Sequence, residues 1–160
     1  ELISKGFDIT QTHIREGISR TRFPGRLELL RHNPDVIIDG AHTPEGMRLL
    51  RSSVQRGYPG RKPLVLFGAL RDKNYEKLAN IIAPISKAVM CVAPESDRSL
   101  ASQDMADTFS RLGVTSYSAD SIQEGFRRLL EMAHDDDLIL AAGSLYMIGP
   151  VRRLCGLTDE

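Results

Sequence analysis

Short runs of apolar residues, rich in branched side chains, recur along this sequence with longer mixed segments between them. The runs span residues 36–38, 64–67, 88–92, 114–117 and 138–140. Each has a length typical of a strand, and we predict that these strands are buried in the core. A further short strand is predicted at residues 27–30, directly after the turn-forming residues 23–25.

Between the predicted strands, apolar residues repeat at helical spacing. The four sets are Met47, Leu50 and Val54; Tyr75, Leu78 and Ile82; Met105, Phe109 and Leu112; and Ile122, Phe126, Leu129 and Ala133. Residues 9–18 also have helical character. Strands that are each followed by a helix need crossover connections. We therefore predict an α/β fold with a mostly parallel, Rossmann-like sheet and helices on both faces.

Composition excludes several classes of function. A chain of 160 residues can bury one core, and its 21 basic residues equal its 21 acidic residues. Without net positive charge, we expect no nucleic-acid partner. No apolar stretch suits a membrane span and no secretory signal is evident, so we expect no membrane association and a cytoplasmic location. Cys91 and Cys155 offer neither a metal spacing nor a disulfide framework, and we expect packing roles.

Candidate chemistry follows the predicted strands, because parallel sheets bind ligands outside the carboxyl ends of their strands. Residues 39–45 leave a strand and enter a helix, with Thr43 as the predicted N-cap and Pro44 in the first turn. The Asp39 carboxylate could accept hydrogen bonds from ribose hydroxyls, and His42 could hold a phosphate or carboxylate. The alternative is that Asp39 caps the turn and His42 packs there.

Two further strand ends carry polar side chains. Arg71 and Lys73 lie in residues 68–74 and could meet an anionic group, although a charge cluster in a solvated loop is the usual explanation of such a pattern. Ser144 and Tyr146 follow the last strand, where Ser144 could also serve only as the cap of the last helix. These positions extend the candidate site to three loops, each of which follows a predicted strand.

Arg26 lies in a Pro-Gly-Arg hinge near the start of the predicted domain. A cation delivered there by domain closure could stabilise charge on a transferring phosphoryl group. The alternative is a solvent-exposed arginine near Arg20 and Arg22. The sequence has no dinucleotide-binding glycine motif, P-loop, nucleophile elbow or zinc-protease motif, so it does not support those functions.

Four ordered motifs, taken together, resemble a known family. They are Phe23-Pro24-Gly25-Arg26-Leu27-Glu28, Val36-Ile37-Ile38-Asp39-Gly40-Ala41-His42, Leu66-Phe67-Gly68 with Asp72-Lys73, and Ala142-Gly143-Ser144-Leu145-Tyr146. They look like the C-terminal domain of folylpolyglutamate synthase/dihydrofolate synthase, in the Mur ligase superfamily. The resemblance covers essentially the whole chain. It implies that residues 1–22 are the tail of a central ATPase domain with its linker, and residues 23–160 the C-terminal domain.

The resemblance implies an ATP-dependent acid–amino acid ligase, which adds L-glutamate to folate or dihydropteroate through an acyl phosphate. By motif, Arg26 and His42 would be catalytic, with Arg26 on the ATP phosphates and His42 between nucleotide and glutamate. Asp39 would contact the ribose. Glutamate would bind Ser144 and Tyr146, with Lys73 as a weaker candidate. The P-loop and Mg²⁺ ligands belong to the family's central domain, so this chain alone is expected to be inactive and to hold no metal.

Two departures from the family pattern keep alternatives open. Thr43 stands where the family often has Asn, and in this it is similar to some peptidoglycan-precursor ligases. Asp97 stands where Pro is usual in the motif of residues 94–100. A muramyl peptide ligase domain would share the fold and the acyl-phosphate chemistry. A non-catalytic nucleotide-binding α/β module is the alternative from another functional class.

Overall fold

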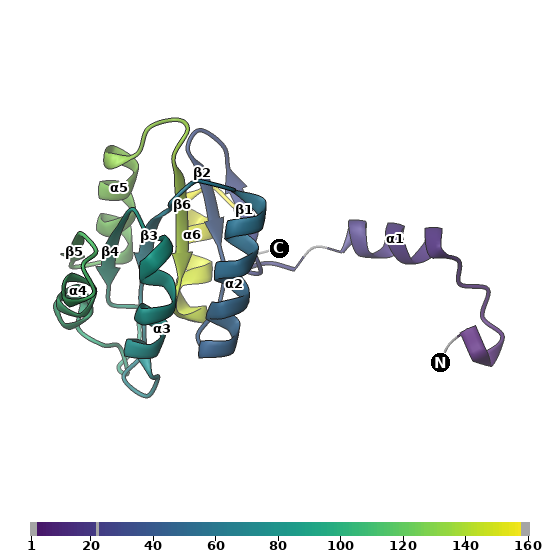
Figure 1. Ribbon diagram of the computed structural model, residues 1–160, viewed down its shortest axis with the longest axis horizontal. Helices are drawn as coiled ribbons and strands as arrows, with labels where there is room; N and C mark the ends of the chain where they lie inside the picture. The colour runs from purple at the N-terminus through teal and green to yellow at the C-terminus, as the bar shows by residue number, and fades with distance from the viewer. Residues whose placement is uncertain (1–2, 22, 158–160) are drawn as a thin grey trace.

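Six strands form a single sheet in the computed structural model, which describes residues 3–21 and 23–157 (Figure 1). The strands are β1 (Glu28–Arg31), β2 (Asp35–Ile38), β3 (Leu64–Phe67), β4 (Ala88–Val92), β5 (Ser116–Ala119) and β6 (Leu138–Ala142). Their order is β1-β2-β6-β3-β4-β5, and every neighbouring pair is parallel except β1 with β2. The predicted α/β class with a mostly parallel sheet is confirmed. Residue 22, the predicted domain boundary, lies outside the described residues.

The position of β6 decides which loops meet. It lies between β2 and β3, with Ile38 opposite Ala141 and Phe67 opposite Ala142. Because these three strands are parallel, their carboxyl ends lie side by side at one edge of the sheet. Three chain segments that are distant in sequence therefore leave the sheet at the same place.

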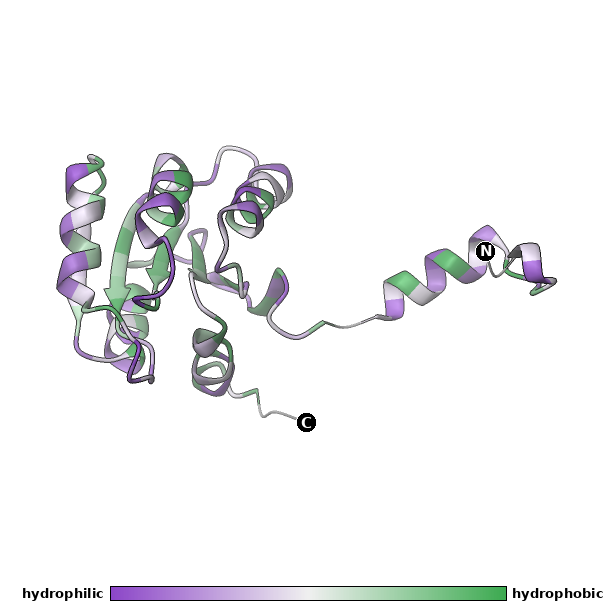
Figure 2. Cartoon of the chain, turned by 90° about the horizontal axis from the view of Figure 1, so that it is seen from below, coloured by the Kyte–Doolittle hydropathy of each residue, from purple (hydrophilic) through white to green (hydrophobic). Residues whose placement is uncertain are grey.

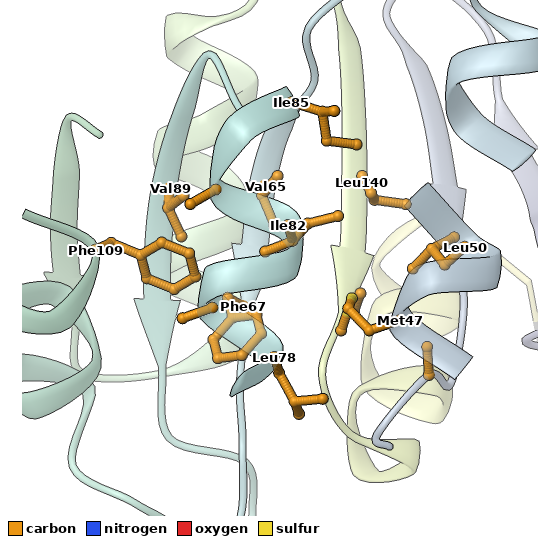
Figure 3. Packing of buried hydrophobic residues seen from close by; sticks show 14 of the residues in the cluster. Met47, Leu50, Val65, Phe67, Leu78, Ile82, Ile85, Val89, Phe109 and Leu140 are labelled. Atoms are coloured by element: carbon orange, nitrogen blue, oxygen red, sulfur yellow. The ribbon is translucent and has the colours of Figure 1, made fainter. Parts of the chain in front are cut away.

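Helices cover both faces of the sheet (Figure 1). They are α2 (Pro44–Gly57), α3 (Tyr75–Ile82), α4 (Ser102–Arg111), α5 (Ile122–Met132) and α6 (Ile148–Leu154), with short 3-10 helices η1 (Ile3–Lys5), η2 (Ala83–Ile85) and η3 (Leu145–Met147). One core cluster packs α2, α3 and α4 against the sheet (Figure 3). In it the Phe67 and Phe109 rings meet edge to face with centroids 5.1 Å apart. A second cluster packs α5 and α6 on the opposite face. The residues with the predicted apolar spacing are therefore buried as expected. The exceptions are Tyr75 and Ala133, which are partly buried, and Leu112, which is exposed.

The first long helix, α1 (Gln11–Arg20), corresponds to the helical pattern predicted at residues 9–18. It begins at Thr10, whose hydroxyl accepts a hydrogen bond from the His13 amide at 3.1 Å. None of its residues is buried, and Figures 1 and 2 show it standing away from the sheet. The apolar residues Ile14 and Ile18 lie on its surface.

The prediction of a buried strand at residues 114–117 is wrong. The strand is β5, two residues further on, and of its four residues only Ala119 is buried. The physical reason is its place at the sheet edge, where one long side has no neighbouring strand. Cys91 is buried in β4, whereas Cys155 is half-buried after α6. None of the described helices is long and apolar enough to cross a membrane.

Candidate functional site

The loop after β2 forms the centre of the site, and its local sequence explains its shape. The Thr43 hydroxyl accepts a hydrogen bond from the Gly46 amide at 3.1 Å, and Pro44 begins α2. Glu45 lies in the first turn, where a negative charge favours a helix. The predicted N-cap is therefore confirmed, and it fixes the direction in which the chain leaves the sheet.

The Asp39 carboxylate binds two backbone amides. Its Oδ1 accepts from the amide of Ala41 and its Oδ2 from the amide of Leu27, both at 2.8 Å. The capping role proposed for Asp39 from sequence is thus confirmed. Since each carboxylate oxygen has two lone pairs, Asp39 keeps acceptor capacity for a ligand hydroxyl.

Arg26 is held above the same loop. The Gly40 amide donates to the Gly25 carbonyl oxygen at 2.8 Å, which joins the hinge to the end of β2. A Cβ atom on Gly40 would lie 3.0 Å from Nη1 of Arg26 and 2.4 Å from Cδ2 of Leu145. A larger residue at position 40 would displace the ends of these side chains, so the small size of Gly40 lets the guanidinium lie over the strand end.

These residues line a first cavity of about 390 Å³. Its wall consists of Arg26, Leu27, Asp39, Gly40, Ala41, His42, Thr43, Gly46, Leu49, Leu50 and Ser53. A cation and a carboxylate thus share a cavity with leucine side chains. Such a wall can bind a ligand that combines an anionic end, hydroxyl groups and an apolar body.

His42 links this cavity to a second one, because it lines both. Its Nδ1 lies 2.8 Å from the carbonyl oxygen of Gly40. A carbonyl oxygen only accepts, so Nδ1 carries the hydrogen, and Nε2 of the neutral ring is left as an acceptor. The fold therefore fixes the tautomer of His42.

The second cavity, of about 160 Å³, lies over the ends of β3 and β6. It is lined by His42, Leu70, Lys73, Arg98, Gly143, Ser144, Leu145 and Tyr146. Ser144 is buried, and its hydroxyl accepts from the Tyr146 amide at 3.2 Å. It caps η3, which runs directly into α6, so the predicted cap lies one short helix earlier than expected. Tyr146 is half-exposed.

Arg98 was not predicted as a site residue. Its guanidinium lies 3.5 Å from the Tyr146 hydroxyl and 3.6 Å from Oδ2 of Asp72, which also lies 3.4 Å from Nζ of Lys73. Desolvation acts to raise the pKa of Asp72, but a backbone hydrogen bond together with Lys73 and Arg98 holds it below its usual value. Arg98 follows β4, so the strand-end rule applied to that strand would have found it.

Arg71, in contrast, does not line either cavity. Its Nε donates to the Ser99 carbonyl oxygen at 2.9 Å, and its amide donates to the Arg98 carbonyl oxygen at 2.8 Å. Arg71 therefore holds in place the loop that carries Arg98. The six residues to which the family resemblance assigns a role, Arg26, Asp39, His42, Lys73, Ser144 and Tyr146, all line one cavity or both.

The chemistry of the two cavities differs in a way that suits two ligands. The first offers one guanidinium, a carboxylate that can accept hydrogen bonds from hydroxyl groups, and apolar walls. The second offers two hydroxyls around a small volume, together with the cations of Lys73 and Arg98, which share Asp72 as an ion-pair partner. The second therefore suits a small anion such as an amino acid with an extra carboxylate. Over residues 3–21 and 23–157, no group of three or more His, Cys, Asp or Glu side chains could hold a metal ion.

Comparisons with known proteins point to one family. A family model described as "Mur ligase, glutamate ligase domain" matches residues 25–145. The chain is 28% identical over 145 residues to the dihydrofolate synthase/folylpolyglutamate synthase of Bacillus subtilis. This alignment covers 91% of this chain and 33% of that protein. It is 30% identical over 148 residues to the folylpolyglutamate synthase of Lacticaseibacillus casei, covering 91% and 32%.

Solved structures show the same fold. Escherichia coli FolC in complex with DHPP and ADP superposes with a TM-score of 0.85 at 22% identity, over 97% of this chain and 36% of that one. The chain thus spans about a third of the length of these relatives. The resemblance drawn from the sequence motifs is confirmed. Because the family model matches three quarters of the residues of this chain, the chain belongs to the Mur ligase family, as a glutamate ligase domain.

Proposed function

We propose that this chain is the C-terminal domain of an ATP-dependent ligase that joins L-glutamate to folate or dihydropteroate. The observation that carries the proposal is the pair of adjoining cavities that share His42, one suited to a nucleotide and one to a small dianionic amino acid. The similarity to folylpolyglutamate synthases supports this choice over a muramyl peptide ligase. The two-cavity site also favours catalysis over a nucleotide-binding module without activity.

In the proposed reaction, ATP phosphorylates the acceptor carboxyl group to give an acyl phosphate and ADP. Arg26 contributes a positive charge to the wall of the first cavity, where it would stabilise the phosphoryl group during transfer. Asp39 would accept a hydrogen bond from a ribose hydroxyl with the lone pairs that its two backbone bonds leave. The apolar wall from Leu27, Leu49 and Leu50 would pack against the rest of the nucleotide.

The second cavity would hold L-glutamate. Lys73 and Arg98 would neutralise its carboxylates, and Ser144 and Tyr146 would donate hydrogen bonds to them. The attacking amine must lose a proton before the C–N bond forms and phosphate leaves. Nε2 of His42 is the acceptor that the fixed tautomer leaves for this proton, and His42 lines the wall between the cavities.

The rest of the enzyme would lie in a preceding domain. We propose that residues 1–22 form the tail of a central ATPase domain, that residues 23–160 form this C-terminal domain, and that the preceding domain carries the P-loop and binds Mg²⁺. The 160-residue chain would then be inactive alone. The proposal places the enzyme in the cytoplasm, where ATP is abundant and thiols such as Cys91 and Cys155 stay reduced.

An NMR titration of the 160-residue chain tests the amino-acid site. L-Glutamate should shift the amides of His42 and Ser144, whereas D-glutamate should shift them less. Lys73→Ala should weaken the response by about tenfold, since it removes one charge-assisted contact. Lys77→Ala removes an exposed lysine from α3 outside both cavities and should leave the response unchanged.

Steady-state kinetics of a complete ligase that contains this domain test the reaction. Arg26→Ala should lower kcat more than it raises the KM for folate, because its contact tightens in the transition state. A response to diaminopimelate in place of L-glutamate would favour a muramyl peptide ligase. An upstream sequence without a P-loop, combined with no ligation, would favour the non-catalytic module.

A further inference from the structure

Glu28 connects the hinge that carries Arg26 to the helix that follows the second cavity. One carboxylate oxygen, Oε2, accepts from the Gly25 amide at 2.7 Å. The other, Oε1, forms an ion pair with Nη1 of Arg152 on α6. The Glu28 and Arg152 side chains are only 22% and 11% exposed, so water screens this pair weakly. Glu28 lines neither cavity, so any effect on the reaction must pass through other residues.

The hinge needs such support because its backbone is strained. Gly25 and Leu27, on either side of Arg26, have φ values of +70° and +44°. The left-handed region is unfavourable for a leucine and persists only where neighbouring contacts enforce it. Each of these two residues donates its amide to a carboxylate, Gly25 to Glu28 and Leu27 to Asp39. The backbone of Arg26 is thus held between two bound amides.

The same hinge packs on α6. A Cβ on Gly25 would lie 2.3 Å from Cδ1 of Ile148, so the buried Gly25 sits directly against the first residue of that helix. The helix in turn follows η3, which carries Tyr146. The ion pair between Glu28 and Arg152 therefore connects two segments. One is η3 with α6, which carries Tyr146 of the second cavity, and the other is the hinge, which carries Arg26 of the first cavity.

We propose that Glu28 is a positioning residue of the ligase reaction, which holds the Arg26 guanidinium over Gly40 by binding the Gly25 amide and anchoring the hinge to Arg152. The proposal rests on the proposed function for its effect on catalysis. Glu28 touches neither nucleotide nor amino acid; its charge fixes where Arg26 stands when the phosphoryl group is transferred.

The matched control is Glu124 on α5, because it has the same pattern of partners. Its Oε2 accepts from the Asp120 amide at 3.0 Å, and its Oε1 lies 3.7 Å from Nη1 of Arg128. It lies outside both cavities. Glu28→Gln and Glu124→Gln therefore remove the same charge from the same kind of arrangement, near the hinge and away from it.

The first measurement is amide hydrogen exchange in the 160-residue chain, with urea unfolding to verify that each variant is folded. Glu28→Gln should speed exchange at Gly25 by about tenfold relative to core amides, as expected when one local bond is weakened. Glu124→Gln should leave Gly25 unchanged. Unchanged exchange at Gly25 in folded Glu28→Gln would overturn the proposal.

The second measurement is kinetics of the complete ligase. Glu28→Gln should lower kcat about tenfold while the KM for glutamate stays within about twofold. In an Arg26→Ala background, Glu28→Gln should lower kcat by less than about a further twofold, because the residue through which Glu28 acts is gone. Full additivity in the two backgrounds would refute a role through Arg26. Absence of glutamate ligation by the unsubstituted enzyme would instead refute the proposed function, and the hydrogen-exchange result would then decide the anchoring of the hinge separately.

Discussion

Asp39 binds two backbone amides and also lines the cavity proposed for the nucleotide, so its replacement by alanine is an informative perturbation. The substitution removes the acceptors of two backbone amides, those of Leu27 and Ala41, each bound at 2.8 Å. A hydrogen bond to a charged group contributes about 1.5–3 kcal/mol. Since the site is partly exposed, we take the lower end for each bond. Asp39→Ala should therefore lower the free energy of unfolding by about 3 kcal/mol.

The assay is urea unfolding followed by far-UV circular dichroism, because the chain has no tryptophan. Asp135→Ala, at an exposed loop position, should stay within about 0.5 kcal/mol of the parent. Asp39→Asn should lie between the two, because its amide oxygen can accept one N–H while its NH₂ group opposes the other. An Asp39→Ala variant as stable as Asp135→Ala would refute the claim that this carboxylate holds the hinge.

This result also decides how nucleotide binding should be tested. Because Asp39→Ala disturbs the hinge that carries Arg26, weaker ATP binding by that variant would not by itself establish a ribose contact. Comparing ATP with 2′-deoxy-ATP and 3′-deoxy-ATP on the unsubstituted complete ligase avoids the difficulty. A ribose contact predicts that at least one deoxynucleotide binds more weakly, by about 1 kcal/mol or somewhat more. Equal binding of all three would argue against it.

Three further outcomes are expected. The pKa of Asp35 is lowered from 3.8, mainly by a hydrogen bond from His32. The ionised carboxylate therefore stabilises the fold above pH 3.8, and this stabilisation is lost as the pH falls below that value. Below pH 3.8, the free energy of unfolding should depend less steeply on pH in Asp35→Asn than in the parent chain, as measured by acid unfolding. Burial raises the pKa of Cys91 to about 12, so mass spectrometry should find it unmodified by iodoacetamide at pH 8 in the folded chain and modified in urea. Gly143→Ala should cost about 2–4 kcal/mol in urea unfolding, since φ is +108° and the new Cβ would lie 2.4 Å from a backbone oxygen; Gly60→Ala, with φ of +79° but open space, should cost about 1–2 kcal/mol.

The predicted bounds of the core strands match the structure where helices cover both faces of the sheet. The runs at β3 and β4 are apolar at every position because helices cover both faces, and their bounds agree with the structure. β5 was misplaced because an edge strand carries half-exposed polar residues such as Ser116 and Ser118, which no apolar run marks. Hydrophobic pattern therefore identifies the centre of a sheet better than its edges.

The candidate site was predictable because chemistry follows strand ends, but its division into two cavities was not. That division depends on β6 lying between β2 and β3, which brings Ser144 beside His42 and Lys73. Strand order results from long-range packing, and a single sequence carries no direct sign of it. Arg98 escaped prediction for a different reason, since it lies several residues beyond the end of β4 and outside the three loops that directly follow β2, β3 and β6.

The exposure of the site residues gives a physical reason why the proposed ligase reaction would need a second surface at these cavities. Arg26 is exposed, and Tyr146 is 46% exposed, so both cavities are open to solvent on one side. An acyl phosphate in contact with water hydrolyses, and a guanidinium acts more strongly on phosphate once water is excluded. The exposed apolar side chain of Leu145 lies beside the second cavity and could pack against a covering surface. The proposed preceding domain would close both cavities, and closure would bring a hinge already fixed by Asp39 against the nucleotide.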